Sequence, residues 1–258
     1  MKIITIANEK GGVGKTTTAT AMASILTQKG YKVLLIDADP QCNSTDTFRG
    51  NTKDVYTLAD VILPDDENRC TIEDAIQQTQ NGDLVPGDTA LKRIDKKLTD
   101  ATDIYRFADA MESLKNENFY DFAIIDTHPG LDMMLESCLL ITDEVIIPLK
   151  AGRYSIAGLN TFVKQIAIIK KRMNPNIKIA GILMVMFVKR EKLSRNAEIF
   201  LKQVADELGT TLFDTKIRRS VAQEDAQSER KCLIDYDAKC TTAIDYVAFV
   251  EEYLAKNS

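Results

Sequence analysis

Short apolar runs rich in isoleucine and valine alternate with longer segments of helical periodicity along the chain. The apolar runs cover residues 2–7, 33–36, 122–125, 145–148 and 179–185. Because they do not alternate with polar positions, they are typical of parallel strands that are buried on both faces. Helical periodicity covers residues 17–28, 103–116, 131–141, 155–172, 194–208 and 241–254. The pattern predicts an α/β fold, a doubly wound, mostly parallel sheet with helices on both faces.

The stretch over residues 48–97 is less regular than the rest of the chain and contains Pro64, Pro86 and Gly87. We expect short helices and surface loops there, with one strand near residues 83–85. No repeat, linker or low-complexity segment is visible in the sequence. We therefore expect a single domain over residues 1–258.

A glycine-rich stretch joins the first apolar run to the first helical segment. It reads Lys10-Gly11-Gly12-Val13-Gly14-Lys15-Thr16-Thr17. Glycines let backbone N–H groups converge on an anion, and a helix N-terminus adds partial positive charge. In such a loop Lys15 reaches the β- and γ-phosphates of a nucleotide, and the Thr16 hydroxyl holds Mg²⁺. Residues 10–17 are therefore the predicted nucleotide-binding loop.

The loop departs from the usual pattern G-x-x-x-x-G-K-[ST] at its first position. Glu9 stands where a glycine is required, and a second lysine, Lys10, follows it. The alternative is a glycine-rich turn that caps a helix and binds no ligand. A phosphate site is favoured because strand, loop, lysine, hydroxyls and helix all agree.

Two acids follow the second apolar run, in the sequence Asp37-Ala38-Asp39-Pro40-Gln41. We expect neither carboxylate to be buried, because an unpaired buried charge is costly. At this place a carboxylate can orient an attacking water or bind Mg²⁺ through water. The alternative is a turn that happens to be acidic, which applies more to Asp37 than to Asp39.

The third apolar run ends in Asp126, an arrangement typical of the Walker B strand, whose acid lies near Mg²⁺. Because many strands end in Asp, this pattern alone is weak evidence for a Walker B strand. It becomes strong in combination with the phosphate loop. His128 follows two residues later. We interpret it as a turn residue rather than a base and assign it no catalytic role.

Composition narrows the classes of function. The formal net charge of −5 argues against a protein coated in basic charge, although it leaves room for a local basic patch. Five cysteines form no C-x-x-C pair, and with one histidine they make no zinc-site pattern. We expect reduced cysteines, no signal peptide ahead of the first strand, and no membrane span.

Three motifs now stand in order: the loop at residues 10–17, the acidic segment with Cys42 and Asn43 at residues 37–43, and residues 124–130. Together they resemble the deviant Walker A ATPases, and most of all the ParA/Soj partition proteins. The resemblance continues at residues 83–87, 145–148, 158–159, 217–220, 225–226 and 236–237. It spans nearly the whole chain.

The resemblance implies a P-loop ATPase that binds ATP and Mg²⁺ and closes as a homodimer around the nucleotide. Lys10 would cross to the phosphates of the other subunit, while Lys15 acts within its own. Asp39 would act on the attacking water, and Asp126 would bind Mg²⁺ through its water ligands. The resemblance further implies slow intrinsic hydrolysis, a ParB-like centromere-binding partner that stimulates it, and a cytoplasmic, nucleoid-associated location.

The same resemblance implies DNA binding without sequence preference in the ATP state. Two basic clusters are candidates, one of Lys189, Arg190, Lys192 and Arg195, the other of Lys216, Arg218 and Arg219. Each follows an apolar run, so we expect them on one edge of the molecule. Neutralised phosphates would make the binding strongly dependent on salt. The alternative is a solvated charged face without a ligand.

Several positions depart from the family pattern. Cys42 stands where glycine is usual, His128 where proline is, Val188 where aspartate is common and Arg218 where proline is common. Gly152 and Arg153 interrupt a segment that often carries a glutamate. The changes at residues 188 and 218 affect the expected adenine contacts and DNA surface. Those at residues 152 and 153 affect the expected dimer contacts or the response to a partner.

Four other functions stay open at this stage. A MinD-like positioning ATPase that binds a membrane needs a basic amphipathic C-terminal helix, whereas residues 250–258 include acids. An ATPase that positions a protein cargo also stays open. A reductase like the nitrogenase iron protein needs two cysteines per chain at the dimer axis, whereas Cys138 has apolar neighbours and no second cysteine shows an evident pairing with it. A non-hydrolysing scaffold would show no turnover with DNA and partner present.

Overall fold

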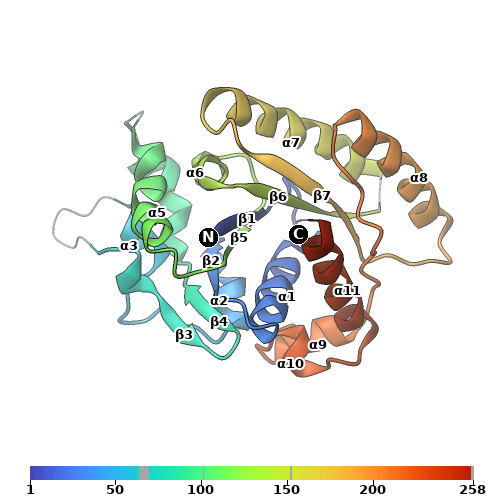
Figure 1. Cartoon of the computed structure of the whole chain (residues 1–258), viewed down its shortest axis with the longest axis horizontal. Coiled ribbons are helices and arrows are strands. Elements are labelled where there is room, and N and C mark those ends of the chain that lie inside the picture. Colours follow the sequence, from blue (N-terminus) through green and yellow to red (C-terminus); the bar gives the residue numbers. More distant parts are fainter. Residues whose placement is uncertain (64–69, 101, 152, 257–258) are drawn as a thin grey trace.

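A seven-stranded sheet lies at the centre of the part of the chain that the structure describes (Figure 1). This computed structural model describes residues 1–63, 70–100, 102–151 and 153–256. The strand order is β3-β4-β2-β5-β1-β6-β7, and only the pairing of β3 with β4 is antiparallel. The strands are β1 (Lys2–Ile6), β2 (Val33–Ala38), β3 (Gln77–Thr79), β4 (Gly82–Val85), β5 (Phe122–Thr127), β6 (Glu144–Lys150) and β7 (Lys178–Val185).

Helices connect the strands and cover the sheet. They are α1 (Lys15–Gln28), α2 (Asn43–Thr47), α3 (Leu58–Ile62), α4 (Ile94–Lys97), α5 (Arg106–Glu117), α6 (Met133–Ile141), α7 (Arg153–Arg172), α8 (Lys192–Glu207), α9 (Ala222–Ser228), α10 (Leu233–Tyr236) and α11 (Thr241–Lys256). Single turns of 3₁₀ helix occur at Glu73–Ala75, Thr89–Arg93 and Asp103–Tyr105. Among the helices described, none is long and apolar enough to cross a membrane.

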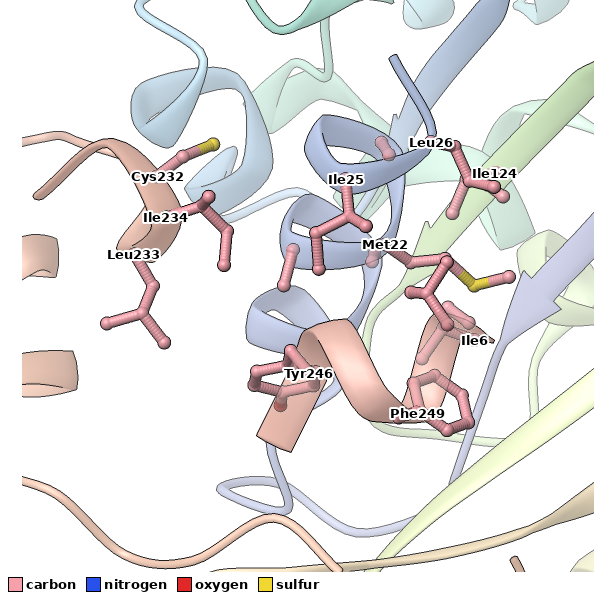
Figure 2. Packing of buried hydrophobic residues seen from close by; sticks show 14 of the residues in the cluster. Ile6, Met22, Ile25, Leu26, Ile124, Cys232, Leu233, Ile234, Tyr246 and Phe249 are labelled. Carbon is pink, nitrogen blue, oxygen red and sulfur yellow. The ribbon is translucent and has the colours of Figure 1, made fainter. Parts of the chain in front are cut away.

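Alternate residues of the central strands enter cores on opposite faces of the sheet. On β6, Ile146 packs in the core with α1 and α11, whereas Val145 and Ile147 pack in the core with α7 and α8. Figure 2 shows Leu26 of α1 beside Ile124 of β5, and Met22 of α1 near Ile6 of β1 and Phe249 of α11. Because both faces carry buried apolar side chains, the strands lack a polar alternation, and the predicted doubly wound fold is confirmed.

The boundaries differ from the prediction in a few places. The strand expected near residues 83–85 is β4, but its antiparallel neighbour β3 was not predicted, because its sequence Gln77-Gln78-Thr79 carries no apolar residue. Helix α1 begins at Lys15, two residues earlier than expected. The short helices α9 and α10 were also missed, since each is too short for a periodic pattern to emerge.

The parallel strands bring distant residues to one edge. The residues that follow β1, end β2 and end β5 all lie at the carboxyl edge, because β5 pairs with both β1 and β2 in parallel. Asp37 and Asp126 are direct partners in the register of β2 and β5. The topology thus assembles the three sequence motifs where ligands bind in open α/β sheets.

Candidate functional site

The predicted phosphate loop turns tightly between β1 and α1. Gly12 and Gly14 adopt left-handed backbone conformations, with φ of 67° and 77°. A Cβ atom added at Gly12 would meet nothing within 4 Å, so backbone conformation rather than crowding favours glycine there. Asn8 fixes the start of the loop, since its Oδ1 accepts from Lys10 N at 3.0 Å and its Nδ2 donates to Pro148 O at 2.8 Å.

Lys15 lies across this loop rather than in solvent. Its Nζ donates to the carbonyl oxygen of Lys10 at 2.9 Å, and the residue is only 6% exposed. Burial lowers the pKa of Lys15, while the negative charges of Asp126 and Asp39 oppose that change. An anion entering the loop would therefore meet an ammonium group that is already oriented.

Asp37 corrects one expectation, because it belongs to β2 and is completely buried. Its carboxylate is not left unpaired. Oδ2 accepts from the backbone N and the Oγ1 of Thr45, both at 2.7 Å, and Oδ1 accepts from Asp39 N at 3.1 Å. Burial nevertheless raises the pKa of Asp37, and the Thr45 bonds only partly offset this.

Asp39 is also buried, at 6% exposure, which is a second correction. Its Oδ1 accepts from Gln41 N at 2.8 Å, so the acidic turn is closed by its own backbone. Gly87 packs on the same turn: a Cβ there would lie 2.9 Å from Asp37 O and 3.1 Å from Asp39 O. Only glycine allows this close approach of the two segments.

Asp126 ends the cluster and has one oxygen without a partner. Its Oδ2 accepts from Ser44 Oγ at 2.8 Å, whereas Oδ1 is buried and has no hydrogen bond within the described residues. Burial raises the pKa of Asp126, and the nearby Asp37 raises it further, while the hydroxyls of Ser44 and Thr16 lower it. A carboxylate oxygen and a hydroxyl beside it are hard ligands of the kind Mg²⁺ prefers. Thr16 and Asp126 therefore fit the predicted metal role.

A cavity of about 700 Å³ opens beside these residues. That volume lies within the range of small-molecule sites, about 300–1,000 Å³. One wall carries the phosphate loop, Thr16, Thr17 and Asp39. The opposite wall comes from the end of β7 and the C-terminal segment, and includes Met186, Ile217, Arg218, Gln223 and Tyr246.

The cavity wall formed by the C-terminal segment contacts the first turn of α1 through two side chains. Tyr246 of α11 is buried, and its hydroxyl lies 3.1 Å from Thr18 Oγ1. Gln223 Nε2 donates to Thr17 Oγ1 at 3.2 Å, while its Oε1 is buried without a partner in the described residues. No local pattern indicates these contacts, because they join residues more than 200 positions apart.

Lys10 lies near α7 in the single chain. A Cβ atom at Gly158 would come within 3.1 Å of Lys10 Cε, so the lysine stem passes directly over that glycine. The backbone of Lys10 holds the loop closed, through its N–H to Asn8 and its carbonyl to Lys15. Action on a second subunit stays a prediction.

Two departures from the family pattern have local explanations. Cys42 has φ of 57°, a left-handed conformation that explains why glycine is usual at that position. His128 Nε2 lies 2.6 Å from Asp132 Oδ2, and Asp132 caps α6 by accepting from Leu135 N. Burial disfavours the imidazolium, but the bond to Asp132 raises the pKa of His128 overall. His128 therefore braces the start of a helix, as a turn residue would.

The two basic clusters do share one edge, as expected. Phe187 N donates to Ile217 O at 2.9 Å, which places the two segments side by side. Lys189, Arg190 and Arg195 are exposed, whereas the side chain of Lys192 lies outside the described residues. Gly152 and the side chain of Arg153 lie outside them as well.

The second cluster is largely compensated by acids. Lys216 Nζ lies 2.6 Å from Glu198 Oε1, and Arg218 Nη2 lies 2.7 Å from Asp245 Oδ1. Arg219 is the most exposed of the three, with its Nη2 3.9 Å from Glu224 Oε1. The exposed first cluster is thus the stronger candidate for an anionic partner, and DNA contact stays a prediction for both.

Sequence comparison finds similar proteins along nearly the whole chain. Residues 1–179 match a family model described as an AAA domain. The chromosome partitioning protein ParA of Caulobacter vibrioides is 32% identical over 260 residues, covering 99% of this chain and 95% of that protein. The sporulation initiation inhibitor protein Soj of Bacillus subtilis is 32% identical over 258 residues, covering 98% of each.

Solved structures of nucleotide-binding proteins also superpose on nearly the whole chain. Cobyrinic acid a,c-diamide synthase from Mycobacterium smegmatis, with bound ATP analogue and magnesium, superposes with a TM-score of 0.81 at 25% identity, covering 97% of this chain and 93% of that one. The cell division ATPase MinD of Pyrococcus furiosus gives 0.78 at 25% identity, covering 100% and 99%. The match supports nucleotide and magnesium binding as properties of this group of proteins.

The buried acids predict an unusual pH dependence of stability. Because the pKa of Asp126 is raised above 3.8 in the folded chain, that chain retains a proton which the unfolded chain releases. The free energy of unfolding without ligand should therefore fall as pH rises from 3.8 towards neutrality. We expect Asp126→Asn to be more stable than the unchanged protein at pH 7 by about 1.4 kcal/mol or more, the equivalent of one pKa unit. Urea unfolding of both proteins across this pH range measures the two free energies of unfolding.

The matched control is Asp109→Asn, which removes an exposed acid from α5. It should leave the pH profile unchanged. Mg²⁺ with nucleotide should stabilise the unchanged protein more than Asp126→Asn, because it binds the ionised carboxylate. A less stable Asp126→Asn chain at pH 7 without Mg²⁺ would contradict the destabilising effect assigned to the buried Asp126 carboxylate.

Proposed function

This chain belongs to the ParA/MinD family of P-loop ATPases, and from that premise we propose that it is an ATP-dependent dimerising ATPase that partitions DNA. The observation that carries the ATPase part is the group formed by the buried Lys15 and Asp126 with the half-buried Thr16. Lys15 is already folded over the loop, and Asp126 Oδ1 has no hydrogen bond within the described residues. That arrangement suits a triphosphate with its cation.

The loop binds the phosphates and Lys15 moves its hydrogen bond to them. Backbone N–H groups of residues 11–15 face the anion, and Lys15 Nζ exchanges the Lys10 carbonyl for a phosphate oxygen. Thr16 would hold Mg²⁺ directly and Asp126 through the water ligands of the ion, which when bound neutralises phosphate charge in the transition state. The depressed pKa of Lys15 would return towards its ordinary value beside the added negative charge.

Asp39 is the residue we assign to the attacking water. It lines the cavity and is nearly buried, and the Gln41 N–H fixes its Oδ1. Its other oxygen can accept a hydrogen bond from a water and so orient it towards the γ-phosphate. With the water oriented rather than strongly activated, intrinsic hydrolysis should be slow.

Lys10 is the residue we assign to dimerisation. A lysine at the loop entrance that reached a partner's phosphates would link nucleotide state to association. Its stem rests over Gly158 in the single chain, so the side chain would have to leave α7 when the dimer closes. The proposal covers one domain over residues 1–258, acting as a pair around two ATP molecules.

DNA and a ParB-like centromere-binding protein are the proposed partners, with a cytoplasmic, nucleoid-associated location. Support comes from the partition proteins that the chain resembles and from the exposed cations Lys189, Arg190 and Arg195. These cations follow Val185 and Met186 in the chain, which line the ligand cavity, and this connection would let DNA contact respond to nucleotide.

A MinD-like positioning ATPase is the second candidate, favoured by the superposition on MinD. The packing of α11 favours partition instead. Its large apolar side chains Tyr246, Phe249, Val250 and Tyr253 are buried against the rest of the fold, as Figure 2 shows for the first two. Ile244 is the large apolar side chain of α11 that stays exposed in the described residues, at 51%, so this helix offers a bilayer a single large exposed apolar residue rather than an apolar face. Flotation of ATP-loaded protein with anionic vesicles would reveal a MinD-like activity.

Hydrolysis should depend on the two cavity residues. With ATP, Mg²⁺ and DNA, Lys15→Ala and Asp39→Ala should each lower phosphate release by about 100-fold or more. Lys15→Ala should also weaken ATP binding, whereas Asp39→Ala should keep it. Lys29→Ala, which removes an exposed ion pair with Glu251 from the end of α1, should retain full activity. An unchanged protein that releases no phosphate with DNA and a ParB-like partner present would exclude the ATPase proposal.

Lys10→Ala should separate binding from dimerisation. The variant should bind ATP within about threefold of the unchanged protein, because Lys15 supplies the cation in the same subunit. It should fail to form the ATP-dependent dimer, measured by sedimentation velocity in an Asp39→Ala background that retains nucleotide. Lys32→Ala in the same background is the control and should dimerise. A normal ATP-bound dimer of Lys10→Ala would refute the assigned role.

DNA binding should follow the first basic cluster. The double variant Lys189→Ala with Arg190→Ala should weaken ATP-dependent binding to unrelated DNA. The slope of log K against log salt should fall by about 1.8, or about 0.9 for each phosphate that is no longer neutralised. Lys170→Ala with Lys171→Ala removes the same charge from the far end of α7 and should leave the slope unchanged. Equal slopes for both pairs would remove DNA contact from this cluster.

A further inference from the structure

We propose that Arg218 binds the base of the nucleotide, with its guanidinium held flat by Asp245 so that one face stacks on the purine ring. This inference rests on the proposed ATPase function. It removes Arg218 from the candidate DNA surface and gives a role to a residue that stands where the family pattern has proline.

Asp245 fixes the guanidinium on one edge. Arg218 Nε donates to Asp245 Oδ2 at 2.8 Å, and Arg218 Nη2 donates to Asp245 Oδ1 at 2.7 Å. Two parallel bonds to one carboxylate define the plane of the group as well as its position. Asp245 is itself only 9% exposed, so this pair is shielded from water on the carboxylate side.

The backbone of Arg218 is held by the same helix. Its N–H donates to Asp245 Oδ2 at 2.8 Å, and its carbonyl accepts from Thr242 Oγ1 at 2.8 Å. Both partners lie in the first turns of α11. Main chain and side chain are therefore fixed together, which is the pre-organisation expected of a binding residue rather than of a mobile surface arginine.

Arg218 faces the ligand cavity beyond the phosphate loop. It lines the cavity together with Met186, Ile217 and Tyr246. Tyr246 follows Asp245 in α11 and contacts Thr18, one residue past the predicted loop. A nucleotide with its phosphates on the loop would extend past the first turn of α1 towards this group, which places the base against Arg218 and its apolar neighbours.

The chemistry left to Arg218 suits an aromatic ring better than a phosphate. Its Nε and Nη2 atoms each donate to Asp245, so one of the two edges through which a guanidinium binds phosphate bidentately is already occupied. The side chain remains 48% exposed, so part of its surface is still accessible. A guanidinium face stacks on aromatic systems, and the neighbouring Met186 and Ile217 exclude water from such a stack.

The cavity wall beside Arg218 also contains a residue with an unfavourable backbone conformation. Met186 has φ of 52°, a left-handed conformation that is uncommon for a residue with a long side chain. Such strain gathers at ligand-binding walls, where the surrounding structure holds it. The strain and the fixed arginine together mark this end of the cavity as a built subsite.

The test compares ligands with and without a base by isothermal titration calorimetry in Mg²⁺. Arg218→Met removes the planar cation but keeps an unbranched side chain. We expect its Kd for ATP to rise about tenfold, the scale of a stacked guanidinium, and its Kd for inorganic tripolyphosphate to stay within about twofold. Arg218→Lys should not restore ATP binding, because an ammonium lacks the flat face. Lys202→Met, which changes an exposed cation on α8 outside both basic clusters, should leave both constants unchanged.

Losing Arg218 leaves Asp245 buried without its cation, so a folding defect must be separated from a binding defect. The double variant Arg218→Met with Asp245→Asn removes both charges, and thermal unfolding should show it folded. It should show the same loss of ATP affinity as Arg218→Met. Asp245→Asn alone should weaken ATP binding several-fold, because the arginine remains but is no longer held flat.

Three outcomes would overturn the inference. Equal losses for ATP and tripolyphosphate would place Arg218 on the phosphates, and unchanged ATP binding in the folded double variant would remove it from the site. A loss of DNA binding by Arg218→Met at saturating ATP, with ATP affinity unchanged, would return Arg218 to the DNA surface. If the unchanged protein bound neither ATP nor tripolyphosphate, the proposed function itself would fail, which is a distinct result.

Discussion

The whole site depends on how three buried carboxylates are balanced. Asp37 and Asp126 face each other on adjacent strands, and Asp39 lies two residues past Asp37. Taken from water without partners, such groups would be costly. Thr45 and Ser44 donate hydrogen bonds to them, and Lys15 is the nearby cation whose charge opposes theirs. What remains is one oxygen of Asp126 without a hydrogen bond in the described residues, and a metal ion would complete the balance.

The phosphate loop could be predicted from the sequence, whereas the burial of Asp37 and Asp39 beside it could not. The loop is local: glycines, lysine and hydroxyls occupy consecutive positions, and the left-handed angles at Gly12 and Gly14 follow from residue type. The prediction that Asp37 stays outside the core was wrong because its partner Thr45 lies eight residues away. Nothing in the spacing of those two residues indicates that α2 folds back under β2.

The same distinction applies to the fold and the far wall of the cavity. Buried parallel strands were predictable because each carries its own apolar run, whereas the polar edge strand β3 owes its pairing to β4 alone. Gln223 and Tyr246 contact the first turn of α1 only through tertiary packing. Their roles become visible when α9, which carries Gln223, and α11, which carries Tyr246, are placed against α1, more than 200 residues earlier in the chain.

Helix α11 connects the first turn of α1 and Arg218 to one rigid element. Tyr246 contacts the first turn of the helix that follows the phosphate loop, and the adjacent Asp245 holds Arg218 in the lining of the same cavity. Phe249 of the same helix packs in the core with Met22 of α1. Because these contacts are close-packed, α11 cannot shift relative to α1 without disturbing the arginine. The segment of Arg218 also pairs with Phe187, two residues before Lys189, so the cavity wall and the exposed basic cluster are parts of one continuous packing arrangement.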